Sequence, residues 1–165
     1  MAKVLQVNIS ETTGVPKVRI EQGYFKVDHG LEGDAHAKNW HRQVSLLAIE
    51  SIEKAKAQIL AKNGDPDILD MGQFAENLTT EGIVLYELPV GTRLKIGETE
   101  MEVTQIGKEC HTGCAIRAIV GDCIMPREGI FAKVLQPGWI KAGDSLEILF
   151  MPAKDKATIP ILDQK

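Results

Sequence analysis

The stretch GTRLKIGETEMEVTQIG, residues 91–107, contains two short runs of β-favouring residues bounded by Gly91, Gly97 and Gly107. Glycines at this spacing are typical of the turns that join short antiparallel strands. Further runs of this kind occur on both sides of the stretch, at 3–10, 17–20, 23–30 and 143–150. Many short strands separated by regular turn signals predict a mainly β fold, either barrel-like or a sandwich.

The first of these runs, KVLQVNIS at 3–10, also predicts which side chains share a face. Strict alternation places the even-numbered residues from Val4 to Asn8 on one face of the strand and the odd-numbered residues from Leu5 to Ile9 on the other.

Residues 48–60 have the periodicity of a helix instead. Apolar side chains recur there at the spacing of one helical face, at Ile49, Ile52, Ile59 and Leu60. We therefore expect one long helix, with Ser45 as a candidate for its amino-terminal cap. Short helices are expected from Arg127 or Gly129 to Leu135 and, as a single turn, over 71–76.

The 165 residues suit a single domain, which we expect over 1–150 with a tail over 151–165. Hydrophobic residues make up 44% and charged residues 25%, as in globular proteins. A net charge of -4 argues against a nucleic-acid-binding surface, which needs clustered Lys and Arg. No run of about 18 apolar residues and no signal-peptide pattern occur, so we expect no membrane span and a cytoplasmic protein.

All three cysteines, Cys110, Cys114 and Cys123, lie within one short stretch, with His111 beside the first. A reducing compartment and an odd number of cysteines argue against disulfides. Three interpretations of the thiols stay open: buried core residues, metal ligands, or a reactive thiolate.

The flanking residues bear on these interpretations. Together with His111, the cysteines supply the right number of donors for zinc, but the paired C-x2-C pattern typical of zinc sites is absent. The nearby cations Lys108 and Arg117 favour a thiolate, which is also the donor that soft metal centres prefer. Cys114 begins an apolar run, CAIRAIV, and therefore equally suits a buried position.

Other segments contribute polar candidates. Asp34 and His36 alternate in DHGLEGDAH, so they form either an orienting or ligand pair, or part of a tight loop. Asn77 and Thr79 in FAENLTTEGI suit a phosphate or a polar ring, but equally suit satisfying backbone groups. Arg127 precedes an expected helix start, where it would bind phosphate or carboxylate, or simply form a surface turn.

Taken together, these stretches resemble the MOSC domain, named for the carboxy-terminal domain of molybdenum cofactor sulfurase. The resemblance runs in the family order from about Gly30 to Ile148 and covers most of the chain. Each piece alone is unspecific, but the ordered set is specific. The matching pieces are GLEGDAH, QVSLLAIESIE, FAENLTTEGI, GTRLKIGE, VTQIGKECHTGCAI, PREGIFAKVL and GWIKAGD.

The resemblance implies a barrel-like fold and a site built around one cysteine, which ligates the metal of a molybdenum cofactor or carries sulfur. The family position of this cysteine matches Cys110 when counted from VTQ and Cys114 when counted back from the apolar run, and we favour Cys110. The candidates for holding the pterin and its phosphate are Asp34, His36, Asn77, Thr79, Lys108 and Arg127.

The function implied by the resemblance is molybdenum cofactor binding or sulfur carriage during cofactor maturation or delivery. The expected partners are molybdenum cofactor biosynthesis proteins or molybdoenzymes. Catalytic relatives carry a further β-barrel or pyridoxal-phosphate domain, and we expect neither here. Two other functions stay open: a partner-dependent molybdenum oxidoreductase of N-hydroxylated substrates, and a non-catalytic interaction module with or without a stabilising zinc ion.

Overall fold

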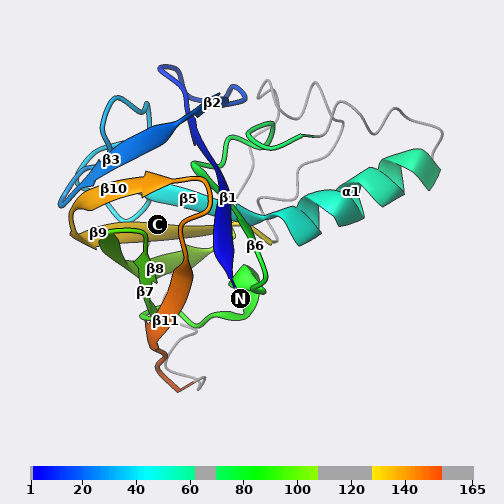
Figure 1. Cartoon of the computed structure of the whole chain (residues 1–165). Coiled ribbons are helices and arrows are strands. Elements are labelled where there is room, and N and C mark those ends of the chain that lie inside the picture. The colour runs from blue at the N-terminus through cyan, green and yellow to red at the C-terminus, as the bar shows by residue number, and fades with distance from the viewer. Residues whose placement is uncertain (1, 62–69, 108–127, 154–165) are drawn as a thin grey trace.

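The computed structural model describes residues 2–61, 70–107 and 128–153 of the chain (Figure 1). Within them, short strands alternate with turns and a single long helix. The strands are β1 (Lys3–Ile9), β2 (Val18–Ile20), β3 (Gln22–Lys26), β4 (Gly30–Leu31), β5 (Val44–Ala48), β6 (Leu78–Glu81), β7 (Arg93–Ile96), β8 (Thr99–Ile106), β9 (Ile130–Gln136), β10 (Gly138–Lys141) and β11 (Leu146–Phe150). The helices are α1 (Ile49–Ala61) and the 3-10 turn η2 (Leu85–Glu87).

The larger sheet has eight strands in the order β11-β7-β8-β9-β5-β6-β1-β2. Neighbouring strands are antiparallel except β5 and β6, which are parallel because α1 forms the crossover between them. A second sheet of three strands, β10-β3-β4, contacts β1, β8 and β9 of the first.

Hydrogen bonds join β1 to the start of β11, so the larger sheet curves back on itself. The backbone N–H of Val4 donates to the carbonyl of Asp144 at 2.8 Å, and that of Leu146 donates to the carbonyl of Ala2 at 3.0 Å. Lys3 and Ser145 form an isolated bridge between them. This curvature and the strand content confirm the expected mainly β, barrel-like fold.

The curved sheet encloses the hydrophobic core. Helix α1 contributes Ile52 and Ala55 to the buried residues, whereas its far end extends away from the sheets and leaves Leu60 exposed (Figure 1). No helix in the described ranges is long and apolar enough to cross a membrane. The largest buried side chains of the core cluster are Phe25, Leu31, Leu46, Leu78, Leu85, Leu94, Ile96 and Met101.

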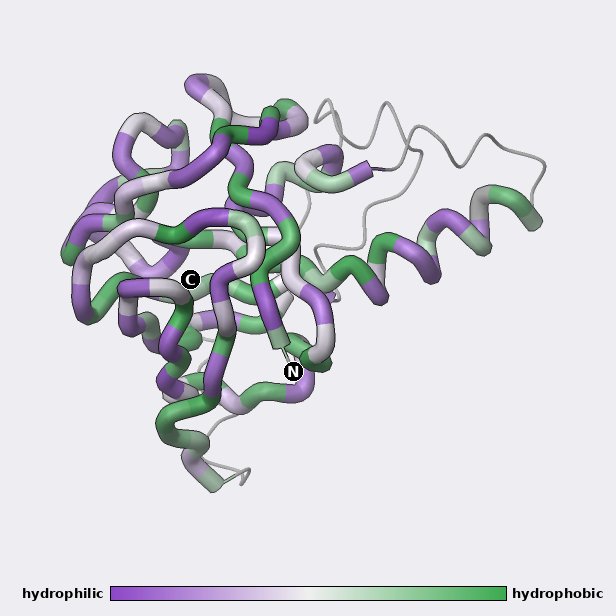
Figure 2. The backbone as a smooth tube through the Cα atoms, in the orientation of Figure 1, coloured by the Kyte–Doolittle hydropathy of each residue, from purple (hydrophilic) through white to green (hydrophobic). Residues whose placement is uncertain are grey.

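The end of β11 is the main exposed apolar stretch of the sheet. Ile148, Leu149, Phe150 and Met151 follow one another and are all exposed. Figure 2 shows this stretch as hydrophobic, at the end of the described chain.

The prediction of a short helix that ends at Leu135 is wrong, because the segment from Ile130 forms strand β9. Ile130 pairs with Ile106 on one side and with Leu46 on the other, so β9 is a central strand. Consecutive residues from Ile130 to Ala132 are buried, which is the pattern of a strand covered on both faces. Pairing on both sides overrides the helical spacing of the apolar residues.

The long helix is confirmed to within one residue at each end, but the proposed cap is wrong. Ser45 lies inside β5, four residues before α1 begins, and its hydroxyl donates to the carbonyl of Ala75 at 3.2 Å. The short helix expected as a single turn over 71–76 is also wrong. The N–H of Ala75 donates to the carbonyl of Gly72 at 3.0 Å, but Gly72 and Ala75 have φ values of 89° and 65°, so the segment is a tight turn and not a helix.

The alternation expected along β1 is interrupted by a β-bulge. The register with β6 shifts between Val4 and Gln6, and Val4, Val7 and Asn8 are all buried. A bulge adds one residue to one strand, which exchanges the faces of the residues that follow it.

Candidate functional site

The three cysteines belong to residues 108–127, called the cysteine segment below, which lie outside the described residues. The described chain nevertheless fixes where this segment begins and ends. Ile106 pairs with Ile130, and the N–H of Gly107 donates to the carbonyl of Gly129 at 2.7 Å. The two strand ends that flank the segment therefore meet at one point, the end of the β8–β9 ladder. The predicted site residues inside it are Lys108, Cys110, Cys114 and Arg127, and Cys123 lies there as well.

Two basic side chains converge on a glutamine at this point. Oε1 of Gln105 lies 2.9 Å from Nε2 of His41 and 3.2 Å from Nε of Arg42, and both nitrogens donate to it. The amide nitrogen of Gln105 donates to the carbonyl of Gly107 at 2.7 Å. Gln105 thus connects His41 and Arg42 to the residue that precedes the cysteine segment.

Cations and aromatic rings alternate around the same point. Nζ of Lys38 lies 4.1 Å from the centre of the Trp40 ring. The guanidinium carbon of Arg42 lies 5.8 Å from the Trp40 ring and 5.5 Å from the Phe131 ring. Neither Lys38 nor Arg42 forms an ion pair with a carboxylate of the described residues. We call Lys38, Trp40, His41 and Arg42 the aromatic–cation cluster. Its charge and ring surface suit a planar, anionic ligand.

Asp34 and His36, which the sequence singled out, lie together around a buried lysine. Nζ of Lys17 is 2.8 Å from Oδ1 of Asp34, 3.1 Å from Oγ of Ser10 and 3.2 Å from Nδ1 of His36. The side chains of Lys17 and Asp34 are both fully buried, whereas that of His36 is 26% exposed. An ammonium group can only donate hydrogen bonds, so Nδ1 of His36 is the acceptor and carries no proton in this arrangement.

Asp34 is held as a carboxylate despite its burial. Burial, the largest influence, raises the pKa of Asp34, but the hydrogen bond and charge of Lys17 and the backbone N–H groups of Ser10 and His36 together lower this pKa below its ordinary value. Trp40 Nε1 donates to the carbonyl of His36 at 2.9 Å, so the buried pair also positions the aromatic–cation cluster.

Asn77 and Thr79 lie in a separate, fully buried network. The carboxamide of Asn77 accepts the N–H of Ser45 at 3.0 Å and donates to the carbonyl of Asn8 at 3.2 Å, which connects β5 with β1. The hydroxyl of Thr79 donates to Oε2 of Glu76 at 2.7 Å and accepts from the amide of Asn8 at 3.2 Å. These contacts correspond to the interpretation in which the two side chains satisfy protein groups.

Glu76 is the most perturbed group of this network. Its Oε2 accepts the N–H of Gly72 at 2.9 Å as well as the Thr79 hydroxyl, while Oε1 is buried with no hydrogen-bond partner in the part of the chain that is described. Burial raises the pKa of Glu76 to about 7. The side chain therefore carries a proton in mildly acidic solution.

The residue that follows the cysteine segment, Glu128, is bonded to α1. Oε2 of Glu128 lies 2.8 Å from Nζ of Lys54, and Oε1 accepts the hydroxyl proton of Ser51. The first turns of α1 therefore fix the residue that follows the segment. Within the described ranges, no group of three His, Cys, Asp or Glu side chains is placed to hold a metal ion.

Sequence reasoning did not identify Lys17 or the aromatic–cation cluster. The run Trp40-His41-Arg42, six residues after Asp34, was a usable signal, because consecutive aromatic and basic residues outside a regular element are candidates for anion binding. Lys17 gave no such signal, since its partners are reached only through the fold.

Several solved structures are similar in fold. YiiM from Escherichia coli superposes with a TM-score of 0.72 and 17% identity, covering 98% of this chain and 76% of that chain. The YUAD protein from Bacillus subtilis superposes with a TM-score of 0.68 and 16% identity, covering 90% of this chain and 96% of that chain. YiiM from Geobacillus stearothermophilus superposes with a TM-score of 0.68 and 16% identity, covering 91% of this chain and 76% of that chain. At these identities the similarity shows a shared fold. A search of curated proteins found no match.

A sequence model of the MOSC domain matches residues 32–147. The matched span includes Asp34, the aromatic–cation cluster and the whole cysteine segment, and it agrees closely with the span of the resemblance seen in the sequence. Because the match covers well over half of the chain, the chain belongs to the MOSC domain family.

Proposed function

We propose that this chain is a molybdenum cofactor-binding or sulfur-carrier domain that acts in cofactor maturation or delivery through a thiolate of the cysteine segment. The MOSC family is associated with molybdenum cofactor biology in general. The observation that carries the proposal is the aromatic–cation cluster, which lies where the segment with every cysteine begins.

The described residues fit the chemistry of such a cofactor. A pterin is planar and its side chain carries a phosphate, so the ring face of Trp40 and the charges of Lys38 and Arg42 are matched to its two parts. The cofactor supplies a molybdenum centre, for which a thiolate is a suitable sulfur donor. In this proposal Cys110, with Cys114 as the other candidate, provides that thiolate.

The remaining side chains have supporting roles in the proposal. Lys17 holds His36 with Nδ1 as an acceptor, and His36 in turn fixes the indole of Trp40 through its carbonyl. Asn77 and Thr79 act by joining strands rather than by touching the pterin. Lys108 and Arg127 keep their predicted role as phosphate-binding residues within the cysteine segment.

The test is to quantify molybdenum, pterin and zinc in protein purified from a host that makes the cofactor. Wild type is compared with Cys110→Ala, Cys114→Ala and Cys123→Ala. We expect molybdenum with pterin in the wild type and its loss in Cys110→Ala, while Cys123→Ala retains both. Near-stoichiometric zinc lost in several variants would instead favour a structural metal site. If the protein contains neither metal nor pterin, even after reconstitution with free cofactor, cofactor binding is removed from the proposal.

A second measurement addresses the aromatic–cation cluster. Arg42→Gln removes the charge, and Lys95→Gln removes an exposed cation from β7 as the matched control. We expect retained pterin to fall about tenfold in Arg42→Gln, because a charge-assisted bond contributes about 1.5 kcal/mol or more, and to be unchanged in the control. Equal retention in both variants would remove Arg42 from the site.

A further inference from the structure

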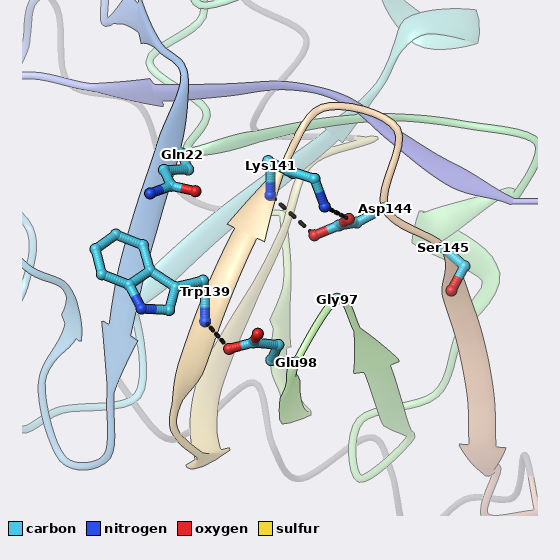
Figure 3. Close-up of a pocket in the computed structure, with 7 residues that line it drawn as sticks. All are labelled: Gln22, Gly97, Glu98, Trp139, Lys141, Asp144 and Ser145. Atoms are coloured by element: carbon cyan, nitrogen blue, oxygen red, sulfur yellow. Dashed lines mark hydrogen bonds and ion pairs between the residues drawn. The ribbon is translucent and has the colours of Figure 1, made fainter.

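A pocket lies at the opposite end of β8 from the cysteine segment. It has a volume of ≈ 380 Å³ and is lined by Gln22, Gly97, Glu98, Trp139, Lys141, Asp144 and Ser145 (Figure 3). Glu98 immediately precedes β8, whereas the cysteine segment follows it. At about 3.3 Å per residue, the eight residues of β8 separate the two places by more than about 20 Å. This pocket is therefore distinct from the proposed cofactor site.

An exposed indole forms one wall of the pocket. Trp139 is 44% exposed, and its ring is steadied by an edge contact with Tyr24, at 5.2 Å between ring centres and 60° between planes. Its backbone is fixed on both sides by Glu98, which accepts the Trp139 N–H through Oε1 at 3.0 Å and donates its own N–H to the Trp139 carbonyl at 3.2 Å. The ring is thus held in place before any ligand arrives.

Two glycines allow the charged walls to come this close. A Cβ on Gly138 would lie 2.6 Å from Cβ of Glu98. A Cβ on Gly97, which has a φ of +55°, would lie 2.6 Å from Oδ2 of Asp144 and 2.9 Å from the carbonyl oxygen of Trp139. Any larger residue at either position would push the acidic side chains or the tryptophan backbone out of place.

The charges of the pocket do not balance. Asp144 is neutralised, because Oδ1 lies 2.9 Å from Nζ of Lys141 and Oδ2 accepts the Lys141 N–H at 2.9 Å. Glu98 forms no ion pair with a cation of the described residues, and its Oε2 accepts no hydrogen bond from them. One negative charge without an ion-pair partner among the described residues thus lines the same pocket as an exposed indole. An indole face and a carboxylate are together the two groups that bind an organic cation.

We propose that this pocket binds a guanidinium group, stacked on the indole of Trp139 and hydrogen-bonded to Oε2 of Glu98. A guanidinium is planar, so one cation uses both features: its face lies on the ring and its edge N–H groups point to the carboxylate. A compact ammonium makes only one of these contacts well. The group comes either from a small arginine-like molecule or from an arginine side chain of a polypeptide, and the volume accommodates a whole residue.

Tryptophan fluorescence provides a direct test. The chain contains two tryptophans, so Trp40→Phe leaves Trp139 as the only reporter. In this background we titrate Nα-acetyl-arginine amide, and as matched ligands the lysine compound and the uncharged, isosteric citrulline compound. The arginine compound is expected to give a saturable change, the lysine compound a weaker one and the citrulline compound none. Equal responses to arginine and citrulline, or no response to arginine, would overturn the proposal.

Matched variants then test the carboxylate. Glu98→Gln keeps an oxygen for the Trp139 N–H but removes the charge, and Glu147→Gln makes the same charge change on β11, outside the pocket. Arginine affinity should fall about tenfold in Glu98→Gln and stay unchanged in Glu147→Gln, with equal melting temperatures. Equal affinity in the two variants would contradict the proposal.

A final comparison separates the two sources of the guanidinium. A short arginine-containing peptide and its citrulline counterpart are titrated by calorimetry beside the single residue. An affinity for the arginine peptide at least tenfold higher than for the residue indicates a polypeptide partner, whereas equal affinities indicate a small molecule. None of these measurements involves the molybdenum cofactor, so their failure leaves the function proposed above intact.

Discussion

The ammonium group of Lys17 lies 2.8 Å from Oδ1 of Asp34, and both side chains are completely buried. The pair connects two segments that are distant in sequence and holds the loop that leads to His36 and Trp40. Because neither charge has access to water, each depends on the other. Breaking such a pair from one side leaves an uncompensated charge, which is far more costly than losing a surface pair.

Lys17→Met should therefore lower the free energy of unfolding by about 3–5 kcal/mol, measured by urea denaturation. Adding Asp34→Asn removes the remaining charge, so the double variant should be more stable than Lys17→Met alone. Lys95→Met, at an exposed lysine on β7, is the control and should change stability by less than about 0.5 kcal/mol. A wild-type urea midpoint for Lys17→Met would show that the buried pair contributes nothing.

Asp34 also predicts how the protein responds to acid. Its pKa is lower in the folded state than in the unfolded chain, so its stabilising contribution is complete above the unfolded pKa and is lost as the pH falls through the folded pKa. The melting temperature of the wild type should drop on acidification, and that of Asp34→Asn should drop less over the same pH range. Parallel curves for the two proteins would contradict this assignment.

The raised pKa of Glu76 predicts the opposite dependence of stability on pH. Its pKa rises from 4.5 to about 7 in the folded state, so its contribution is complete below the unfolded pKa and is lost as the pH rises through 7. Between pH 5 and pH 8 the free energy of unfolding should decrease by about 2–3 kcal/mol in the wild type because of this group. In Glu76→Gln this decrease should be absent, as measured by urea denaturation at a series of pH values.

Substitution of Asn77 tests whether this residue has a structural role or a ligand-binding role. Asn77→Ala leaves the N–H of Ser45 and the carbonyl of Asn8 without their buried partner, and stability should fall by about 2–3 kcal/mol. Once the variant is folded, its pterin affinity should match that of the wild type, because the side chain is fully buried. Normal stability with reduced pterin binding would instead make Asn77 a ligand-binding residue.

Thr80, in strand β6, differs from Asn77 in that its buried polar atom has no hydrogen-bond partner among the described residues. Its hydroxyl is buried, and no described residue forms a hydrogen bond with it. Thr80→Val keeps the shape and removes this polar atom, so thermal unfolding should show unchanged stability or a gain of up to about 1 kcal/mol. A clear loss of stability would show that the hydroxyl has a partner, such as a bound water.

Local sequence signals were sufficient where the structure is local. Gly91 and Gly97 have φ values of 99° and 55°, so these turns need the residues that the pattern identified. The helix from Ile49 to Ala61 followed from its apolar spacing, although only its first half packs on the sheet, through Ile52 and Ala55, and Leu60 of the predicted face is exposed. The proximity of Asp34 and His36 followed from their position in one short loop.

Sequence signals failed where distant segments decide the outcome. Strand β9 has apolar residues at helical spacing, but pairing with β5 and β8 on both sides determines its conformation. The bulge in β1 arises from its register with β6, which no pattern within the first ten residues contains. The partner of Asp34 is Lys17, and only the folded chain brings the two together. Pairings of this kind depend on tertiary contacts, which override local propensity.

The hydrogen bond between Gly107 and Gly129 bears on how this protein evolves. The β8–β9 ladder brings these two residues together through its own pairing. Doubling the length of such a connection costs only about 0.6 kcal/mol in closure entropy. The entropy of chain closure therefore opposes a change in the length of this connection only weakly. Natural selection on the length of the connection meets little resistance from this term.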